Sequence, residues 1–243
     1  MNRAMLIVLA LMLGAGDARA QSGAWIDRGY VSASGWYQPS AAAFSAVVRP
    51  IDFVEPSLVD TSYTIQSEIG VDAGGGVRVW RGLAVGASVS RFSKSGRGSV
   101  SAQVPHPFFF NRPRPVSGDA AGLTRDETAL HVQARWVVPF GRRWQLGIAG
   151  GPSWFLVGQD LVRDVTVTQT YPFDTATFDG VTSQHRSGSG AGFNAGADLD
   201  YMVRPRVGLG IGVTFSRARL ALDDATTVTA GGAHVGGGLR FRF

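Results

Sequence analysis

Apolar and polar side chains alternate with a period of two in several stretches of the chain, a pattern typical of β-strands with two unlike faces. In the C-terminal stretch 233–243, one set of alternate positions is apolar and the other holds Arg, Gly and His. The same alternation predicts further strands. Together with 233–243, the predicted strands number eight: 28–38, 69–80, 83–90, 130–138, 144–149, 193–203 and 207–216 precede it.

The connections between these predicted strands are alternately short and long. Arg81-Gly82, Gly141-Arg142 and Arg204-Pro205 make tight turns, whereas the other connections are longer, and the last one, around Asp223-Asp224, is of modest length. Short turns on one rim and long loops on the other are typical of transmembrane barrels, and an even strand count places both termini on the short-turn rim. We therefore expect an all-β fold, a closed eight-stranded antiparallel transmembrane β-barrel.

Aromatic residues support a membrane location for this barrel. They lie near the predicted short turns rather than in mid-strand, where a soluble core would need them. This position fits a girdle at the membrane–water interface. The residues are Trp80, Trp136, Phe140, Trp144 and Tyr201.

The N-terminal residues predict export from the cytoplasm. Arg3 precedes the apolar run 6–13, and Ala18-Arg19-Ala20 follows as a cleavage site, so residues 1–20 are predicted to be a cleaved signal peptide. The apolar run is too short to span a bilayer, which takes about 20 residues as a helix. Residues 21–243 then form the outer-membrane β-barrel domain. The chain has no cysteine, which excludes a lipid-anchored N-terminus, disulfides and a thiol nucleophile.

The composition adds a charge and many glycines to this picture. The net charge is +5, and for an exported protein the anionic neighbours are lipopolysaccharide and other outer-membrane lipid rather than nucleic acid. The 33 glycines fit strands that bend strongly or line a crowded lumen. The chain has neither a nucleic-acid motif nor metal-ligand spacing, and we expect no cofactor.

Energy decides which face of the strands meets lipid. A charged side chain facing lipid at mid-membrane costs about 2–4 kcal/mol, so the face that carries the charges points inward. The lumen of an eight-stranded barrel is just filled by side chains, here including Trp80, and buried charges in it must pair. We therefore expect hydrated pockets broken by Arg–Asp contacts, with no open pore and no enzymatic site in the lumen. The predicted lumen polar network is Asp72, Arg78, His131, Arg135, Asp198, Asp200, His234 and Arg240.

The end of the chain resembles the C-terminal strand of bacterial outer-membrane β-barrels, whose terminal Phe is part of their assembly signal. The matching residues are Phe243, Phe241, Leu239 and Val235. The whole mature chain resembles the small eight-stranded OmpA/OmpX-type barrels, and the hairpin 71–92 also looks like those of the outer membrane protein β-barrel domain family. This resemblance implies an outer-membrane location, with the β-barrel assembly machinery and periplasmic chaperones as partners during biogenesis. It fixes no activity, because fold does not imply function.

One short motif has candidate chemistry. His185-Arg186-Ser187 is similar to the His-x-Ser motif of the PagL-type lipid A deacylases, small barrels that hydrolyse lipid at the membrane face. A His at that spacing on one strand face can act as the base for a Ser nucleophile. The family motif continues with Asn-Ala, whereas Gly188-Ser189 follows here. The simpler interpretation is a polar loop tip.

A second feature is the run Phe108–Phe110 among Pro and Arg residues. This loop either folds over the barrel mouth and packs on itself, or forms a contact surface for lipopolysaccharide or a partner. From the sequence we expect an integral outer-membrane barrel with a structural or surface-interaction role and no catalysis. Two alternatives stay open: a narrow pore or transporter for small or hydrophobic solutes, and a lipid A-modifying enzyme. Activity, if present, should lie in the long loops or on the outer wall.

Overall fold

The structure is a computed structural model that describes residues 28–39, 42–65, 67–223 and 226–243. The predicted signal peptide, residues 1–20, lies outside these residues. Nearly all of the described chain is β-strand, and it contains no helix that is long and apolar enough to cross a membrane. The strands are β1 (Gly29–Gln38), β2 (Ala42–Val48), β3 (Ile51–Asp52), β4 (Glu55–Pro56), β5 (Leu58–Ile65), β6 (Glu68–Trp80), β7 (Leu83–Val104), β8 (Arg114–Phe140), β9 (Trp144–Thr168), β10 (Thr177–Arg204), β11 (Val207–Ala221), β12 (Thr227–Ala230) and β13 (Ala233–Arg242).

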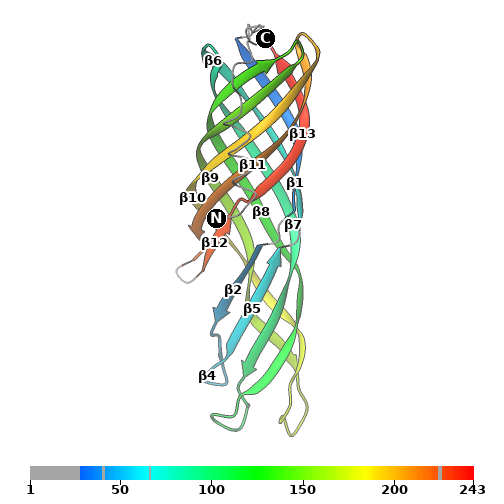
Figure 1. The fold of residues 1–243 in the computed structure, drawn as a ribbon. Helices are drawn as coiled ribbons and strands as arrows, with labels where there is room; N and C mark the ends of the chain where they lie inside the picture. Colours follow the sequence, from blue (N-terminus) through cyan, green and yellow to red (C-terminus); the bar gives the residue numbers. More distant parts are fainter. Residues whose placement is uncertain (1–27, 40–41, 66, 224–225) are drawn as a thin grey trace, which may run out of the picture.

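A ring of eight strands closes the barrel (Figure 1). The order around the ring is β6-β1-β13-β11-β10-β9-β8-β7, all neighbours are antiparallel, and β7 pairs with β6 to close it. The first and last strands lie side by side, with Tyr30 opposite Arg242 and Tyr37 opposite Val235. Closure leaves no strand edge with unpaired backbone groups facing lipid. The predicted closed eight-stranded antiparallel barrel is confirmed.

The three predicted tight turns connect β6 to β7, β8 to β9 and β10 to β11. Two of them contain a residue with positive φ, Arg81 at 40° and Gly141 at 67°, a conformation that tight hairpin turns commonly need. The C-terminus lies at the same end of the molecule as these turns (Figure 1).

Strands β7, β8, β9 and β10 of the ring continue far beyond the barrel on the opposite side (Figure 1). We call this region the head and define it as residues 42–65, 94–124, 160–185 and 217–223. Its first wall is a sheet of β2, β5 and the extended parts of β7 and β8, and its second wall is the extended β9–β10 hairpin. The two walls separate because the β8–β9 pairing ends at Arg125 opposite Gln159.

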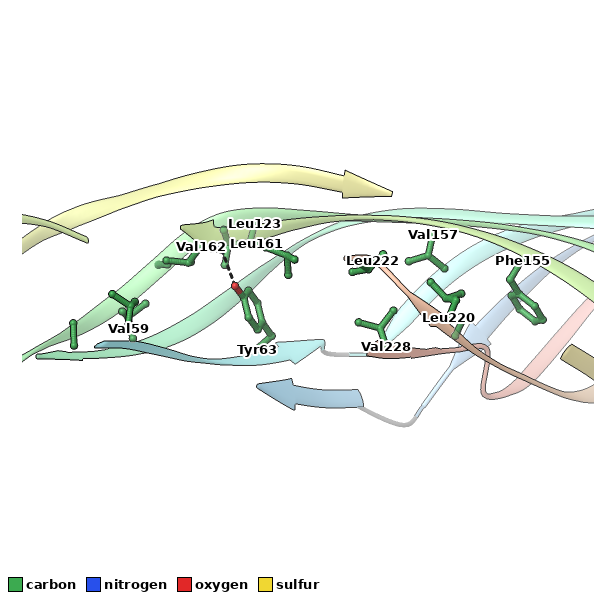
Figure 2. Close-up of a cluster of buried hydrophobic side chains, with 14 of the residues drawn as sticks. Val59, Tyr63, Leu123, Phe155, Val157, Leu161, Val162, Leu220, Leu222 and Val228 are labelled. Atoms are coloured by element: carbon green, nitrogen blue, oxygen red, sulfur yellow. Dashed lines mark hydrogen bonds between the residues drawn. The ribbon is translucent and has the colours of Figure 1, made fainter. Parts of the chain in front are cut away.

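An apolar core fills the head and continues down to the barrel mouth (Figure 2). Tyr63 stacks on Phe44 at 4.5 Å, and its hydroxyl accepts a hydrogen bond of 2.7 Å from the Val162 N–H of the opposite wall. Full burial of a side chain such as Leu161 stabilises the folded state by about 1.5–3 kcal/mol. The core includes Val59, Val100, Ala102, Val104, Val116, Ala120, Leu123, Phe155, Val157, Leu161, Leu220, Leu222 and Val228.

The polarity of the two faces reverses between barrel and head. Along β11, the outward residues from Leu209 to Phe215 are apolar, whereas Arg217 and Arg219 on the same face are exposed cations. On the inward face, glycines and Thr214 are followed by the buried Ala218 and Leu220. The barrel is therefore polar inside and apolar outside, and the head is the opposite.

The head corrects three predictions. The long connections are mostly β-strand rather than loop, because β7 to β10 continue into the head and β2 and β5 lie within the first connection. His185-Arg186-Ser187 lies on β10 and not at a loop tip. The Phe108–Phe110 loop joins the far ends of β7 and β8, so it lies at the distal tip of the head rather than over the barrel mouth.

Candidate functional site

The centre of the lumen holds a chain of charges that crosses from one wall to another. The Arg135 guanidinium from β8 donates to the carboxylates of Asp198 and Asp200 on β10, the latter at 2.8 Å. Asp200 also pairs with Arg240 of β13 at 3.3 Å, and Arg240 donates to Ser34 Oγ of β1 at 3.0 Å. These contacts connect four of the eight strands of the ring.

A second layer of polar side chains lies toward the head. His131 contacts Ser153 Oγ through Nδ1 at 2.7 Å and Ser90 Oγ through Nε2 at 3.2 Å. Asn194 donates to Ser153 Oγ at 2.8 Å and accepts from Gln133 at 2.8 Å. The buried polar groups of this layer therefore satisfy one another across β7, β8, β9 and β10.

Two further contacts lie at the end of the lumen that faces the head. His234 Nε2 lies 2.7 Å from Gln38 Oε1, and its ring stacks on Trp36 at 4.2 Å. Nearer to the head, the buried Arg125 and Glu127 form an ion pair of 3.2 Å. The remaining space in the lumen includes a cavity of about 130 Å³, which Asp72 lines.

The structure thus places seven of the residues predicted for the lumen network on the inward face, in the contacts just described: Asp72, His131, Arg135, Asp198, Asp200, His234 and Arg240. Arg78, the eighth, is half-buried near the turn rim. The sequence could not identify the partners, because each contact joins residues far apart in the chain. Arg125 and Glu127 were missed, although both lie on the inward alternate of β8. No group of three or more His, Asp or Glu in the described residues is arranged to hold a metal ion.

The prediction that Trp80 fills the lumen is wrong. A register shift between Arg78 and Trp80 interrupts the alternation, and the Trp80 side chain is 56% exposed. It lies outside the barrel with its ring 6.2 Å from that of Trp136. Trp80 therefore belongs to the girdle near the turns, where Trp144 and Tyr201 also pack together at 4.8 Å.

The outer wall of the barrel is a continuous apolar surface. It includes the residues of the predicted assembly signal, Val235, Leu239, Phe241 and Phe243, all of which are exposed. A monomer in water rarely exposes so large an apolar area, whereas the lipid-facing band of a membrane barrel requires it. Other members of this belt include Ile69, Val71, Val77, Val89, Val132, Ile148, Leu156, Leu209, Ile211 and Val213.

Comparison with known proteins gives a structural answer only, since no family model and no curated protein sequence matches the chain. Neisserial surface protein A has a similar structure, with a TM-score of 0.51, 12% identity, and coverage of 88% of this chain and 97% of that one. OprG from Pseudomonas aeruginosa also matches, with a TM-score of 0.45, 8% identity, and coverage of 89% and 96%. The first of these is an outer-membrane barrel, in agreement with the ring and the apolar belt.

The protein is an eight-stranded outer-membrane β-barrel.

In such a barrel the short turns face the periplasm, so the head projects from the cell surface. The resemblance in structure shows the fold and no activity.

The outer surface of the protein carries a cluster at the junction of barrel and head, beyond the lipid belt. His185 Nδ1 lies 2.8 Å from Asp160 Oδ1, which faces it across the β9–β10 pair. Burial acts to raise the pKa of the Asp160 carboxyl, but hydrogen bonds from Thr124 and His185 outweigh it and hold this pKa below its usual range. His185 and Ser187 both line a shallow groove on this surface.

The glycine opposite Ser187 lets the imidazole reach toward that serine. Gly158 is the cross-strand partner of Ser187, and a Cβ on Gly158 would lie 2.7 Å from His185 Nε2. The ring therefore extends over Gly158, with Nδ1 on the Asp160 carboxylate and Nε2 over the glycine that pairs with Ser187. Ser, His and Asp are, in this order, the nucleophile, the base and the orienter of a nucleophile–base–orienter arrangement.

The distal tip of the head is the other exposed cluster. The loop 105–113, the β3–β4 turn and the loop 169–176 present apolar side chains to solvent. The rings of Phe108 and Phe173 are 5.5 Å apart, and the Arg112 guanidinium lies 5.3 Å from the centre of the Phe109 ring. The exposed members are Ile51, Phe53, Val54, Phe108, Phe109, Phe110 and Tyr171.

Buried polar side chains fix the tip loops to one another. The Arg114 guanidinium donates to Gln169 Oε1 at 2.6 Å, to the Phe173 carbonyl at 2.9 Å and to the Pro105 carbonyl at 2.7 Å. The Asn111 N–H donates to Glu55 Oε1 at 2.7 Å and joins the β3–β4 turn to the same unit. The tip is therefore a braced surface formed by three segments.

Proposed function

We propose that the protein is a surface-interaction barrel whose head binds a phospholipid surface outside the cell through its apolar tip. One observation supports this proposal above the others. Outside the lipid belt, large apolar side chains protrude at the distal tip, with Val54, Ile51, Phe110 and Phe108 exposed by 91%, 78%, 73% and 70%. Exposed apolar clusters of this kind mark interaction sites on membranes or proteins.

The backbone at the tip favours a functional role over a chance exposure. Phe53 and Val54 adopt positive φ values of 48° and 70°, which are uncommon for a bulky residue and rare for a β-branched one. Such strain persists only where the surrounding structure imposes it, and it is often found at functional sites. Here the strained turn holds two apolar side chains in water.

The chemistry of the tip favours lipid as the partner. Its apolar side chains are exposed on loops at the end of the head, so they can enter a bilayer interface without a matching groove on the partner. Arg112 lies beside the aromatic cluster, and a cation next to apolar side chains suits a surface of phosphates over acyl chains.

The test uses the purified barrel in nanodiscs and separate vesicles of phosphatidylcholine and phosphatidylglycerol. We expect the protein to float with the vesicles, and the double substitution Phe108→Ser and Phe110→Ser to abolish this. The matched control is Ser101→Ala with Ser117→Ala, an exposed cross-strand pair on the wall of the head. Flotation that is absent in the unmodified protein, or unchanged in the Phe variant, contradicts the proposal.

The lumen geometry argues against the pore alternative. The chain of ion pairs from Arg135 through Asp200 to Arg240 crosses the lumen. The apolar core of the head fills the protein's interior farther from the turns. We expect no stable single-channel conductance from the purified barrel in planar bilayers. Stable conductance would promote the transporter alternative.

A second candidate is hydrolysis of an acyl ester in an outer-leaflet lipid, which the 2.8 Å contact between His185 and Asp160 beside Ser187 favours. In this scheme Ser187 Oγ attacks the ester carbonyl carbon and gives its proton to His185 Nε2, which passes the proton to the departing alcohol. Water then hydrolyses the acyl-serine. The groove lies beside the exposed Leu156 at the edge of the belt, within reach of lipid acyl esters.

Mass spectrometry of lipid A from an expressing strain tests the second candidate. We expect the loss of one ester-linked acyl chain with the unmodified protein and no loss with Ser187→Ala. Ser183→Ala, an exposed serine on the same strand, serves as the control and should behave like the unmodified protein. Unaltered lipid A, or equal activity in Ser187→Ala, rejects the hydrolase scheme.

A further inference from the structure

A cavity of about 250 Å³ lies at the junction of barrel and head. Tyr63 and Leu123 form its apolar wall, and Lys94, Arg125 and Gln159 line it with polar groups. This volume is well above the space that one water molecule needs. Tyr63 on β5 and Leu123 on β8 flank β7 in the first head wall, and both lie near Leu161 and Val162 of the second wall (Figure 2).

The strand pairing explains why the cavity exists. β7 pairs with β6 as far as Arg91 and with β5 from Arg97 onward. Within the described residues, Phe92–Gly96 has no ladder partner on that side. Across the cavity, the β8–β9 ladder ends at Arg125 opposite Gln159, where the two walls of the head diverge.

Two buried side chains at the cavity have polar atoms without a partner in the described protein. Arg125 is 5% exposed and Gln159 is 2% exposed. Arg125 Nη2 binds Glu127 at 3.2 Å and the Thr229 carbonyl at 3.0 Å, but its Nη1 has no hydrogen-bond partner. Gln159 Nε2 donates to the Asp160 carbonyl at 3.2 Å, which leaves its Oε1 without a donor.

The charge around the cavity is positive. Lys94 and Arg97 line it together with Arg125, and Glu127 is occupied by Arg125 and the Gly231 N–H. The nearby Asp160 faces away, toward His185 on the outer wall. A free guanidinium N–H needs an acceptor, preferably an anion, and a free amide oxygen needs a donor.

We propose that this cavity binds a small hydroxy-carboxylic acid with a short apolar chain. The carboxylate accepts from Arg125 Nη1, the hydroxyl donates to Gln159 Oε1, and the chain lies against Tyr63 and Leu123. Lys94 adds positive charge to the wall, and its ammonium is held by the Ser67 carbonyl.

Calorimetry on the purified barrel in a neutral detergent tests this with three probes of equal chain length: 3-hydroxyhexanoate, hexanoate and hexan-1-ol. We expect the hydroxy acid to bind about tenfold more tightly than hexanoate, the factor of one hydrogen bond, and hexan-1-ol not to bind measurably. Absent binding of the hydroxy acid overturns the proposal and leaves only water as the occupant. Equal binding of hexan-1-ol also overturns it, because the carboxylate would then not be recognised.

Two variants separate the contributions of the polar groups. Gln159→Met should remove the preference for the hydroxy acid and keep hexanoate binding, while Arg125→Lys should weaken both acids about tenfold. Arg142→Lys, in the exposed periplasmic turn, is the charge-matched control for Arg125→Lys and should bind as the unmodified protein does. If Arg125→Lys fails the heat-modifiability check for folding, the Gln159→Met result decides. A preference for the hydroxy acid that survives Gln159→Met contradicts the assigned contacts.

Discussion

Strands β7 to β10 run through both the barrel and the head, but the two regions place opposite chemistry on their two faces. On β8, His131 and Arg135 point inward and Val132 outward in the barrel, whereas Val116 points inward and Asp119 outward in the head. Lipid surrounds the barrel and water surrounds the head. The apolar face therefore turns toward lipid in one region and toward a closed core in the other.

This difference shows that alternation alone defines two faces but does not say which face is inside. The surrounding medium determines which face is inside. Along β11, the outward face changes from apolar to cationic between Phe215 and Arg217. The consequence for stability is that the barrel depends on buried ion pairs and the head on apolar packing.

Removing a lumen charge should have the largest effect. Asp200→Ala removes the carboxylate that pairs with both Arg135 and Arg240, and we expect the barrel to lose about 3–5 kcal/mol of unfolding free energy. Urea unfolding, followed by the mobility shift of the heat-modifiable barrel on gels, measures this loss. Asp179→Ala on the exposed head surface is the control. An unchanged unfolding midpoint for Asp200→Ala contradicts the importance of this network.

A core substitution in the head should act locally. Leu161→Ala removes a fully buried side chain and should destabilise the head by about 2–5 kcal/mol. We expect faster proteolysis within the head while the barrel stays heat-modifiable. Thr166→Ala, exposed on the same strand, should leave the digestion rate unchanged. Unfolding of the whole protein by Leu161→Ala would show that the two regions are not separate in stability.

Substitutions on the outward face of β11 test the boundary between the regions. Val213→Arg places a charge in lipid and should cost about 2–4 kcal/mol. Arg219→Leu on the same face lies in water and should change stability by about 0.5 kcal/mol or less. Urea unfolding of the two variants, refolded into the same lipid, gives the comparison. A large loss of stability for Arg219→Leu, or none for Val213→Arg, would contradict a boundary between lipid and water at Phe215 to Arg217.

Much of the barrel could be predicted from the sequence, because glycine-rich strands with one apolar face and tight turns have a strong local signature. The ring, the turns and the outward position of residues such as Val235 and Phe241 follow from it. The head was missed because its strands continue from the barrel without a break and alternate between small residues, as Val100 and Ala102 do among serines. Trp80 was misplaced because a register shift reverses side-chain direction and leaves no mark in the pattern.

The candidate sites were predictable only in part. Alternation placed Arg135 and Asp200 on one face, but it gave no partners, since these depend on register and strand tilt. His185 and Ser187 could be paired by their spacing, whereas Asp160 joins them only through the β9–β10 register. The junction cavity depends on where two ladders end, a property of the assembled sheet that no local stretch of residues encodes.

A cysteine scan along β11 tests the reversal of polarity most directly, because the chain contains no cysteine of its own. A nitroxide attached at each outward position of the refolded protein in bilayers reports its exposure to dissolved oxygen and to a water-soluble nickel complex. Labels at Leu209, Ile211, Val213 and Phe215 should be accessible to oxygen alone, and labels at Arg217 and Arg219 to nickel. Nickel access at 211 and 213, or lipid exposure at 217 and 219, would contradict the division of this protein into a lipid-embedded barrel and a water-exposed head.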